Sequence, residues 1–305
     1  MVEYNRSWES TAGPHVSRRR FLQMFGGVVL GTAAMGAGGW TYVTKIEPTW
    51  IDFVEVKLHL PRLAPAFDGF RMVQITDIHL SDAITADKLT EVCSLVVEQA
   101  PDLVVMTGDY LFRRRRLQGR IDSFLSAVQG LTSALPVVGV LGNHDYRVGA
   151  SRMRQMLSAA GIRELENDVM TIERGGSQLH IAGVDDPWLG NPRLNDVLEK
   201  VPEQGAAILL AHEPDYADQS AATGRFDLQL SGHSHGGQVV LPLIGPPLLP
   251  HMGEKYPSGL YQVGSMLQYT SRGLGMVDPF VRFNCRPEVT LFTLYSVEGD
   301  DSLAG

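Results

Sequence analysis

Five short polar segments, each directly after an apolar run, constrain the fold of this chain more than any other feature of its sequence. The segments are DIH at 77–79, GD at 108–109, GNHD at 142–145, His212 and GHSH at 232–235. The preceding apolar runs cover 70–75, 103–106, 136–141, 206–211 and 226–230. Runs of this length are typical of buried strands, and open α/β sheets bind ligands at the carboxyl ends of their strands. The sequence therefore predicts an α/β domain with the polar segments gathered at one edge.

The side chains in these segments are those that divalent metal ions bind. They supply carboxylate, imidazole and amide groups and no thiolate, a set suited to hard or borderline cations. Asp77 and His79 lie two positions apart, so a pleated strand would point both side chains to one side. This spacing predicts that the two residues bind one ion together, and His233 and His235 repeat it.

Asp109 follows a buried-strand run and a Thr-Gly turn, which places a carboxylate at a strand mouth, where it can bridge two ions. One such residue alone would usually be a turn former. The joint pattern favours a metal site, because most of the nine histidines fall in the five segments. His59 and His180 lie in alternating strand-like runs and are assigned no function.

Taken in order, the segments resemble the signature of the calcineurin-like metallophosphoesterases: DxH, GD, GNHD or GNHE, a lone His, and GHxH. The resemblance extends from about residue 51 to about residue 295. It implies an αββα sandwich, in which two mixed sheets are flanked by helices and a dinuclear metal site lies at the C-terminal edge of the strands. It also implies two divalent metal ions, and manganese, zinc and iron are all compatible with these ligands.

The same resemblance implies a role for each site residue. One ion would be held by Asp77, His79, Asp109 and His235. The other would be held by Asp109, Asn143, His212 and His233, which makes Asp109 the bridge. His144 is expected to stabilise transition-state charge or to protonate the leaving oxygen. Asp145 is expected to orient His144.

The predicted function follows from the charge of such a site. Two divalent cations bring about four positive charges and Asp77 and Asp109 return two, so the site attracts phosphate. A metal-bound hydroxide is then expected to attack phosphorus in line. The chain is predicted to be a phosphohydrolase, and within that class a phosphodiesterase. Two alternatives stay open: a UDP-2,3-diacylglucosamine pyrophosphatase of lipid A synthesis, and a non-catalytic, metal-stabilised envelope binding protein.

The N-terminus carries a second motif. Residues 17–23, SRRRFLQ, resemble the twin-arginine export motif and lead into the uncharged stretch 21–44. Such a stretch is also long enough for a membrane helix, with the arginines ahead of it on the inner side. We therefore expect a signal or membrane anchor over 1–47 and a catalytic domain over 48–305. Both interpretations put the catalytic domain outside the cytoplasmic membrane, in the periplasm or on the envelope side, and cleavage of the segment is left open.

The rest of the chain alternates strand-like and helix-like patterns. Helices are predicted over 85–100, 122–131, 151–160 and 194–201. Further strands are predicted over 168–173, 178–183, 259–263, 266–270 and 289–296. Periodicity by itself indicates only a mixture of the two. The two cysteines, Cys93 and Cys285, lie outside the polar segments, and no disulfide is expected between them.

Composition and two loops bear on the partners. The net charge of −8 argues against a nucleic-acid partner. The expected partners are the twin-arginine translocation machinery, the membrane through the N-terminal segment, and a phosphoester substrate, with lipid and cell-wall phosphate both open. An arginine cluster at 113–116 and an apolar, proline-rich loop at 239–250 both follow ligand segments closely. For both, and for Asp185 and Asp186, an ordinary loop role is the simpler interpretation.

Overall fold

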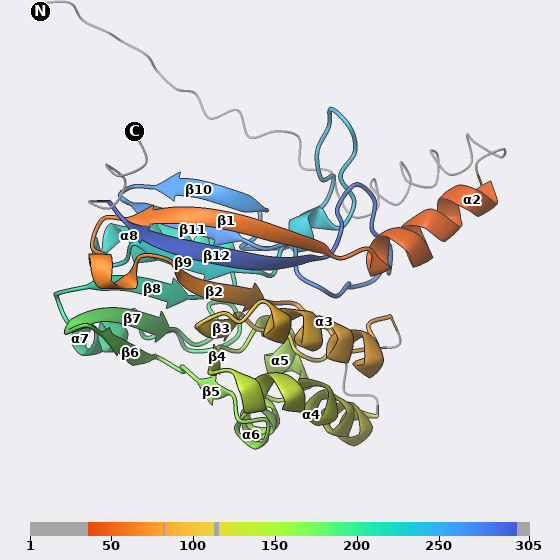
Figure 1. The fold of residues 1–305 in the computed structure, drawn as a ribbon. Helices are drawn as coiled ribbons and strands as arrows, with labels where there is room; N and C mark the ends of the chain where they lie inside the picture. Colours follow the sequence, from red (N-terminus) through yellow and green to blue (C-terminus); the bar gives the residue numbers. More distant parts are fainter. Residues whose placement is uncertain (1–35, 82, 113–115, 298–305) are drawn as a thin grey trace, which may run out of the picture.

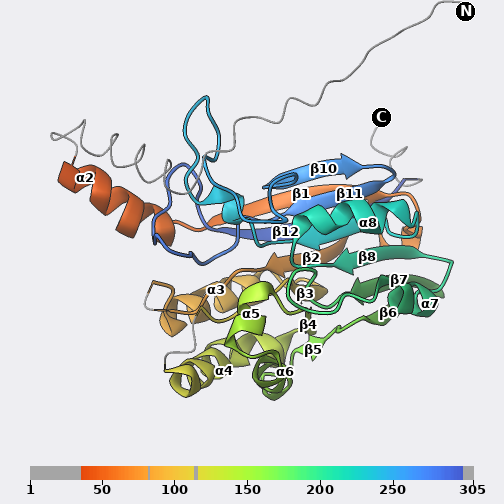
Figure 2. The ribbon, with the colours of Figure 1, turned by 180° about the vertical axis from the view of Figure 1, so that it is seen from behind.

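The computed structural model describes residues 36–81, 83–112 and 116–297 of the 305. The twin-arginine motif and residues 113–115 of the arginine cluster lie outside these described residues. Two six-stranded sheets pack against each other and carry helices on their outer faces (Figures 1 and 2). The predicted αββα sandwich of two mixed sheets is thus confirmed.

The first sheet has the strand order β1-β12-β2-β3-β4-β5. Its strands are β1 (Asp52–Leu60), β12 (Glu288–Ser296), β2 (Phe70–Ile75), β3 (Leu103–Met106), β4 (Val137–Gly139) and β5 (Arg163–Glu164). Strands β2 to β5 are parallel, whereas β12 runs antiparallel to β2 and parallel to β1. The C-terminal strand therefore lies between two strands from the start of the domain.

The second sheet has the strand order β10-β11-β9-β8-β7-β6. Its strands are β10 (Gly259–Val263), β11 (Met266–Thr270), β9 (Leu228–Ser231), β8 (Ala206–Leu210), β7 (Ser177–Gly183) and β6 (Asp168–Arg174). The four central strands are parallel, and β10 and β6 close the two edges as antiparallel strands. Both sheets thus direct several parallel strands toward one edge.

Strand alternation divides the apolar residues into separate cores. In β2, Met72 faces the core between the sheets, whereas Val73 faces the core beneath the helices. In β8, Ile208 and Leu209 divide in the same way. Because both faces of these strands are covered, β8 is continuously apolar, and only Arg71 and Gln74 interrupt the apolar residues of β2.

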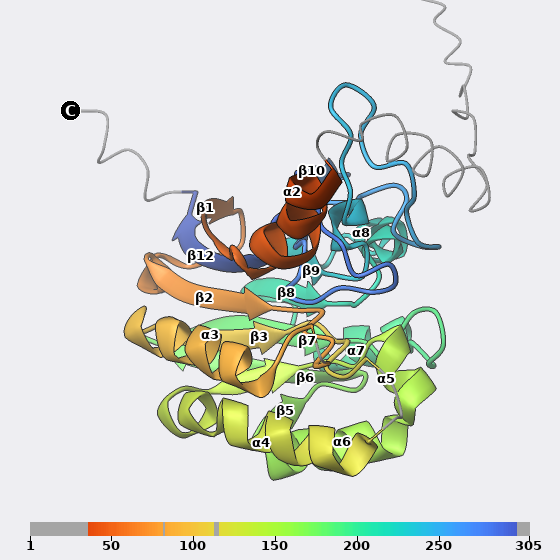
Figure 3. The same ribbon diagram turned by 90° about the vertical axis from the view of Figure 1, so that its right-hand side faces the viewer.

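Helices cover the outer faces of both sheets (Figure 3). The first sheet is covered by α3 (Ala86–Glu98), α4 (Leu117–Ala134) and α6 (Ala150–Ala159). The second sheet is covered by α7 (Leu194–Lys200) and α8 (Ala217–Ala222). Helix α4 begins at Leu117 rather than at the predicted residue 122, because its first turn is exposed and lacks the apolar periodicity that begins at Ile121. Cys93 and Cys285 are both buried and free, as expected.

The described part of the N-terminal segment packs onto the catalytic domain. It comprises α2 (Gly36–Thr41), η1 (Tyr42–Ile46) and η2 (Glu47–Thr49). Arg282 N donates to Val43 O at 2.9 Å, and Cys285 N donates to Glu47 Oε1 at 2.6 Å. None of the helices in the described part of the chain has both the length and the hydropathy to cross a bilayer. The division into residues 1–47 and 48–305 remains a prediction.

Candidate metal centre

The predicted site residues converge where parallel strands of both sheets end. Each of the five polar segments follows its strand directly, as the sequence predicted. The pairs do not continue the strand pleat, however. Asp77, His79, Asp109, His233 and His235 all have left-handed backbones, with φ between 44° and 69°. The prediction that strand alternation aligns Asp77 with His79 is therefore wrong; tight left-handed turns after the strands bring the side chains together.

The first cluster joins Asp77, His79 and His235. The Nε2 atoms of His79 and His235 lie 3.1 Å apart, and His235 Nε2 lies 3.4 Å from Asp77 Oδ1. Asp77 also accepts the backbone N–H of His233 at 3.0 Å. Since Asp77 follows a strand of the first sheet and His233 a strand of the second, this bond joins the two sheets at the site.

Asp109 lies at the centre of the site. Its Oδ2 is 3.4 Å from His79 Nε2 and 3.3 Å from His212 Nε2. Its Oδ1 accepts the backbone N–H of His144 at 2.8 Å. One oxygen of Asp109 thus faces a histidine of each predicted metal position. A carboxylate that bridges two ions must lie between them in this way.

Asn143 and His233 complete the second cluster. One terminal atom of the Asn143 amide lies 3.3 Å from both His233 Nδ1 and Asp109 Oδ2, and the other lies 3.2 Å from the guanidinium nitrogens of Arg147. His233 Nε2 faces His251 O at 2.8 Å and His212 Nδ1 faces Thr107 O at 2.6 Å. Such carbonyl contacts fix the ring proton on the outer nitrogen and leave the inner nitrogen as a ligand.

These contacts test whether the residues fit two divalent ions. The side-chain atoms that could ligate an ion lie 3.1 to 3.4 Å apart within the two clusters. Ligand atoms about 2.1 Å from a shared cation lie about 3.0 to 3.4 Å apart. The observed spacing and the oxygen and nitrogen donor set both fit this requirement, so the residues present suit a dinuclear centre.

Burial tunes the ionisation of these groups toward metal binding. It lowers the pKa of His79 and of His233 to about 3 each, so both imidazoles are neutral at pH 7. Burial raises the pKa of Asp77 to about 6. It would also raise the pKa of Asp109, but the charges of His212 and His144 outweigh burial and hold this pKa well below its usual range. At neutral pH His79 and His233 are therefore neutral and Asp77 and Asp109 ionised, the forms that ligate metals. His212 differs: burial would lower its pKa, but the charge of Asp109 outweighs burial and holds this pKa well above its usual range, so an ion would displace its proton.

Asp145 does not act as predicted. Its carboxylate accepts the backbone N–H groups of Asp109 at 2.8 Å, Tyr110 at 3.0 Å and Gly142 at 2.9 Å. These bonds tie the loop after β3 to the loop after β4, so Asp145 positions Asp109 rather than the imidazole of His144.

His144 borders the cavity beside the two clusters. Its ring stacks on Phe112, with centroids 5.9 Å apart, and lies edge-on to His79 at 4.7 Å. Its Nε2 is 3.3 Å from Arg147 Nη1. Burial lowers the pKa of His144, and the charge of Arg147 lowers it further. The charge of Asp109 acts in the opposite direction but does not outweigh them. Phe112 and Arg147 thus fix the ring at the edge of the site, where its ligand atom lies within 4.8 Å of those of His79 and Asp109.

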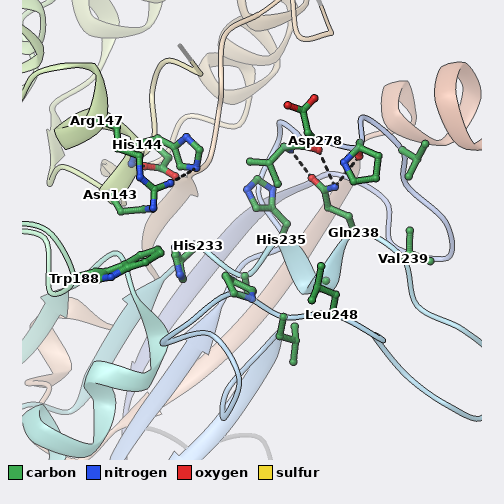
Figure 4. Close-up of a pocket in the computed structure, with 18 residues that line it drawn as sticks. Asn143, His144, Arg147, Trp188, His233, His235, Gln238, Val239, Leu248 and Asp278 are labelled. Atoms are coloured by element: carbon green, nitrogen blue, oxygen red, sulfur yellow. Dashed lines mark hydrogen bonds between the residues drawn. The ribbon is translucent and has the colours of Figure 1, made fainter. Parts of the chain in front are cut away.

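A cavity of about 320 Å³ opens over the clusters (Figure 4). It is lined by Arg147 and Trp188, whose guanidinium and ring lie 4.8 Å apart. Sequence reasoning missed both. The sequence offered a signal only for Arg147, one helical turn after Asn143 in the short helix α5 (Asn143–Val148). A third omission is Glu213, a buried carboxylate whose Oε1 lies 3.9 Å from His233 Nδ1.

Asp185 and Asp186 shape the loop that carries Trp188. Asp186 Oδ2 accepts the N–H of Leu189 at 2.6 Å, and Asp185 Oδ2 accepts the N–H of Asn191 at 2.8 Å. Both therefore form turns in the loop that carries Trp188, as the simpler interpretation of the sequence predicts.

Comparisons with known proteins agree with this geometry. The family model described as "Calcineurin-like phosphoesterase" matches residues 70–237. The chain is 37% identical to the uncharacterized metallophosphoesterase YkuE of Bacillus subtilis over 284 residues, covering 92% of this chain and 98% of that protein. It is 31% identical to the phosphodiesterase YaeI of Escherichia coli over 285 residues, covering 92% and 99%.

Proposed function

Because the chain belongs to the calcineurin-like phosphoesterase family and is a phosphoester hydrolase, we propose that it is a dinuclear phosphodiesterase that acts outside the cytoplasmic membrane. The observation that carries the proposal is the convergence of seven predicted ligands on two adjoining clusters. They are Asp77, His79, Asp109, Asn143, His212, His233 and His235.

The ligands divide between two positions that share Asp109. Asp77, His79 and His235 would hold one ion with it, and Asn143, His212 and His233 the other. When bound, two divalent cations supply Lewis acidity toward the phosphoryl oxygens and lower the pKa of water. Manganese, zinc and iron all suit these donors.

The remaining residues act on the substrate. Arg147 lines the cavity beside His144 and offers a fixed positive charge to a phosphate oxygen. His144 borders the same cavity, where its ring N–H can donate to the leaving oxygen. Trp188 supports the guanidinium of Arg147 from one side.

A diester is favoured by the shape of the cavity. It extends from the metal clusters to Val239, Leu248 and Val277, so a second substituent on phosphorus has room away from the leaving group. The similarity to a protein named as a phosphodiesterase supports the same choice.

The test uses the full chain in detergent, loaded in turn with manganese, zinc and iron. We expect release of nitrophenol from bis(p-nitrophenyl) phosphate at least about tenfold faster than from p-nitrophenyl phosphate, because only the diester fills both ends of the cavity. Absence of turnover with every metal would refute the enzymatic proposal, and a faster monoester would refute the diester preference.

Export by the twin-arginine route is the second part of the proposal. It is supported by the arginine motif at residues 17–23 and by the fit of the site to metals that are bound as the protein folds. Replacing Arg18 and Arg19 with lysine is expected to retain the protein in the cytoplasm, as measured by cell fractionation. Unchanged export of this variant would point to another route.

A further inference from the structure

The cavity has a polar half and an apolar half. In Figure 4, His144, Arg147, Trp188 and His233 lie on one side and Val239 and Leu248 on the other, with His235 between them. The apolar half is lined by Val239, Leu248, Leu249, Pro250, Val277 and Val281, with Gln238 and Asp278 as polar residues among them. The predicted metal ligands lie on the polar side of the cavity. Binding of a phosphate group therefore does not explain why the opposite side is apolar.

The apolar half is a built wall. The side chain of Gln238 donates from Nε2 to Val277 O at 3.1 Å and to Pro279 O at 3.2 Å, and its Oε1 accepts Val277 N at 2.6 Å. The backbone adds a bond from Phe283 N to Gln238 O at 2.9 Å. These bonds hold the segments 238–250 and 277–283 together, so the wall is formed before any ligand binds.

The wall continues into an exposed apolar tip. Leu241 and Gly245 exchange backbone hydrogen bonds of 3.0 and 2.9 Å, which closes a tight turn. The side chains of Leu243 and Ile244 at this turn are exposed, with relative accessibilities of 108% and 71%. Leu243 also has a left-handed φ of 67°, which is unfavourable for leucine. Neither side chain contributes to the domain core, which indicates an external role.

The N-terminal elements add apolar side chains beside this tip. Val240 N donates to Phe283 O, and the adjacent Arg282 N donates to Val43 O, both at 2.9 Å. These bonds place η1 next to the wall, and Figures 1 and 2 show α2 and the tip at the same end of the molecule. Trp40 in α2 is 56% exposed. Several exposed apolar residues thus gather near the apolar end of the cavity.

A lipid bilayer fits this surface better than another protein. In the sequence, the uncharged stretch 21–44 follows three arginines and includes α2 and the start of η1. A stretch of this composition partitions into membranes, and tryptophan favours the membrane interface. The part of this stretch that the structure describes lies at the end of the molecule where Leu243 and Ile244 are exposed.

Resting on the proposed diesterase function, we propose that the substrate is a phosphoester of an amphiphile, taken from a bilayer surface on which α2 and the tip rest. The phosphate lies at the ligand clusters, and the hydrocarbon portion lies along the wall. Hydrolysis consumes one water: its oxygen forms a new bond to phosphorus, one phosphorus–oxygen ester bond breaks, and the leaving oxygen receives a proton. The products are a phosphomonoester and an alcohol.

The first arm of the test measures chain-length preference in solution. The full-length protein in detergent is given methyl and octyl p-nitrophenyl phosphate below their aggregation limits. We expect kcat/KM for the octyl ester to exceed that for the methyl ester by at least about tenfold, since each buried methylene adds to binding. Leu248→Gln is expected to reduce this ratio to about threefold or less, because it replaces part of the apolar wall with a polar group.

Leu260→Gln is the matched control, because Leu260 is 47% exposed on β10 and does not line the cavity. It should keep the parental ratio. Equal kcat/KM for the two esters in the parental protein would overturn the amphiphile proposal and leave the diesterase function standing. Absence of turnover of both esters would instead refute the proposed function itself.

The second arm tests the bilayer as the source. A hexadecyl p-nitrophenyl phosphate is presented in phosphatidylcholine vesicles to the parental protein and to Leu243→Ser/Ile244→Ser. The variant is expected to lose at least about fivefold of its vesicle turnover, because surface binding scales with buried apolar area. Its turnover of the methyl ester should be unchanged, since neither side chain lines the cavity. If this variant turns over the vesicle substrate as fast as the parental protein, the proposal that the tip docks on the bilayer is overturned.

Discussion

At the scale of single residues, the candidate site is defined by potential ligand atoms that lie close together. The Nε2 atoms of His79 and His235 are 3.1 Å apart, and one terminal atom of the Asn143 amide lies 3.3 Å from both His233 and Asp109. Neighbouring donors of this kind would share an ion when it is bound. His144 and Arg147 line the cavity beside them and are the residues proposed to act on the substrate.

His144→Ala tests this division of roles. Metal content should remain at the parental level, and kcat should fall by roughly 10² to 10⁴, because a proton donor to the leaving oxygen is lost. Metal analysis and diester turnover check both parts. His59→Ala is the control, since His59 stacks on Tyr295 in the first sheet. A parental rate in His144→Ala would remove the catalytic role.

The raised pKa of Asp77 predicts how metal affinity depends on pH. Burial raises this pKa to about 6, so the carboxylate is ionised above pH 6 and protonated below it. An ion that binds below pH 6 must displace that proton. We expect metal affinity to fall as the pH is lowered and to fall more steeply below about pH 6, by roughly a further factor of ten per pH unit. Competition with a chelating dye measures this affinity. Asp77→Asn should lack this change of slope; if it keeps the change, another group is responsible.

The residues that converge in the candidate site were predictable because each kind of side chain occurs in an ordered motif. The residues that hold the substrate were not. Trp188 reaches the cavity only because Asp185 and Asp186 fold its loop back, and no local pattern encodes that. Asp145 was assigned to His144 from adjacency in the sequence, whereas its carboxylate lies close to backbone N–H groups of another loop.

At the scale of elements, the turns after the strands depend on glycines that leave room for the ligands. A Cβ on Gly142 would collide with Asp109 Oδ1, and one on Gly232 would collide with Asp77 Oδ2. The GNHD and GHSH motifs thus need glycine for space as well as for turn formation. The backbone at Gly142 and Gly232 lies so close to the carboxylates of Asp109 and Asp77 that no larger residue fits without a shift.

Gly142→Ala is therefore expected to displace Asp109 and to abolish binding of both ions. Gly130→Ala is a matched control within α4, where an added Cβ meets nothing within 4 Å. Because alanine favours helix, the control should raise the free energy of unfolding by about 0.5 to 1 kcal/mol. Metal analysis and denaturant unfolding measure both. Full metal binding by Gly142→Ala would mean that the loops adjust and that the glycine is not required.

Strand positions were well predicted, since continuous apolar runs such as those of β3 and β8 require burial on both faces. The geometry beyond the strand ends was not predictable in the same way. Left-handed residues other than glycine, such as Asp77 and His233, are imposed by tertiary contacts against local preference. Helix α5 was missed because its sequence, NHDYRV, begins within a motif that resembles a turn.

At the scale of the whole molecule, the metal centre joins the two sheets. Asp77, Asp109 and Asn143 follow strands of the first sheet, whereas His212 and His233 follow strands of the second. The sheet order was not predictable from periodicity, because β12, from the C-terminus, inserts between β1 and β2. The family resemblance predicted the two-sheet sandwich but not this strand order.

Since the ions link both sheets, chelation should destabilise the entire domain. Removing both ions, each held at about 100 times its dissociation constant, should lower the melting temperature by about 10 to 20 °C, because the folded state loses roughly 2.7 kcal/mol of binding energy for each ion. Differential scanning fluorimetry with and without chelator checks this. An unchanged melting temperature would show that the ligands are held by the protein fold alone.

The central claim is that two ions share Asp109, and the metal stoichiometry of Asp109→Ala tests it most directly. Elemental analysis of the metal-loaded protein should find two ions per parental chain and none per variant chain, because neither position keeps its ligand set without the bridge. Retention of one or both ions by the variant would contradict the shared-carboxylate site on which this account of the molecule depends.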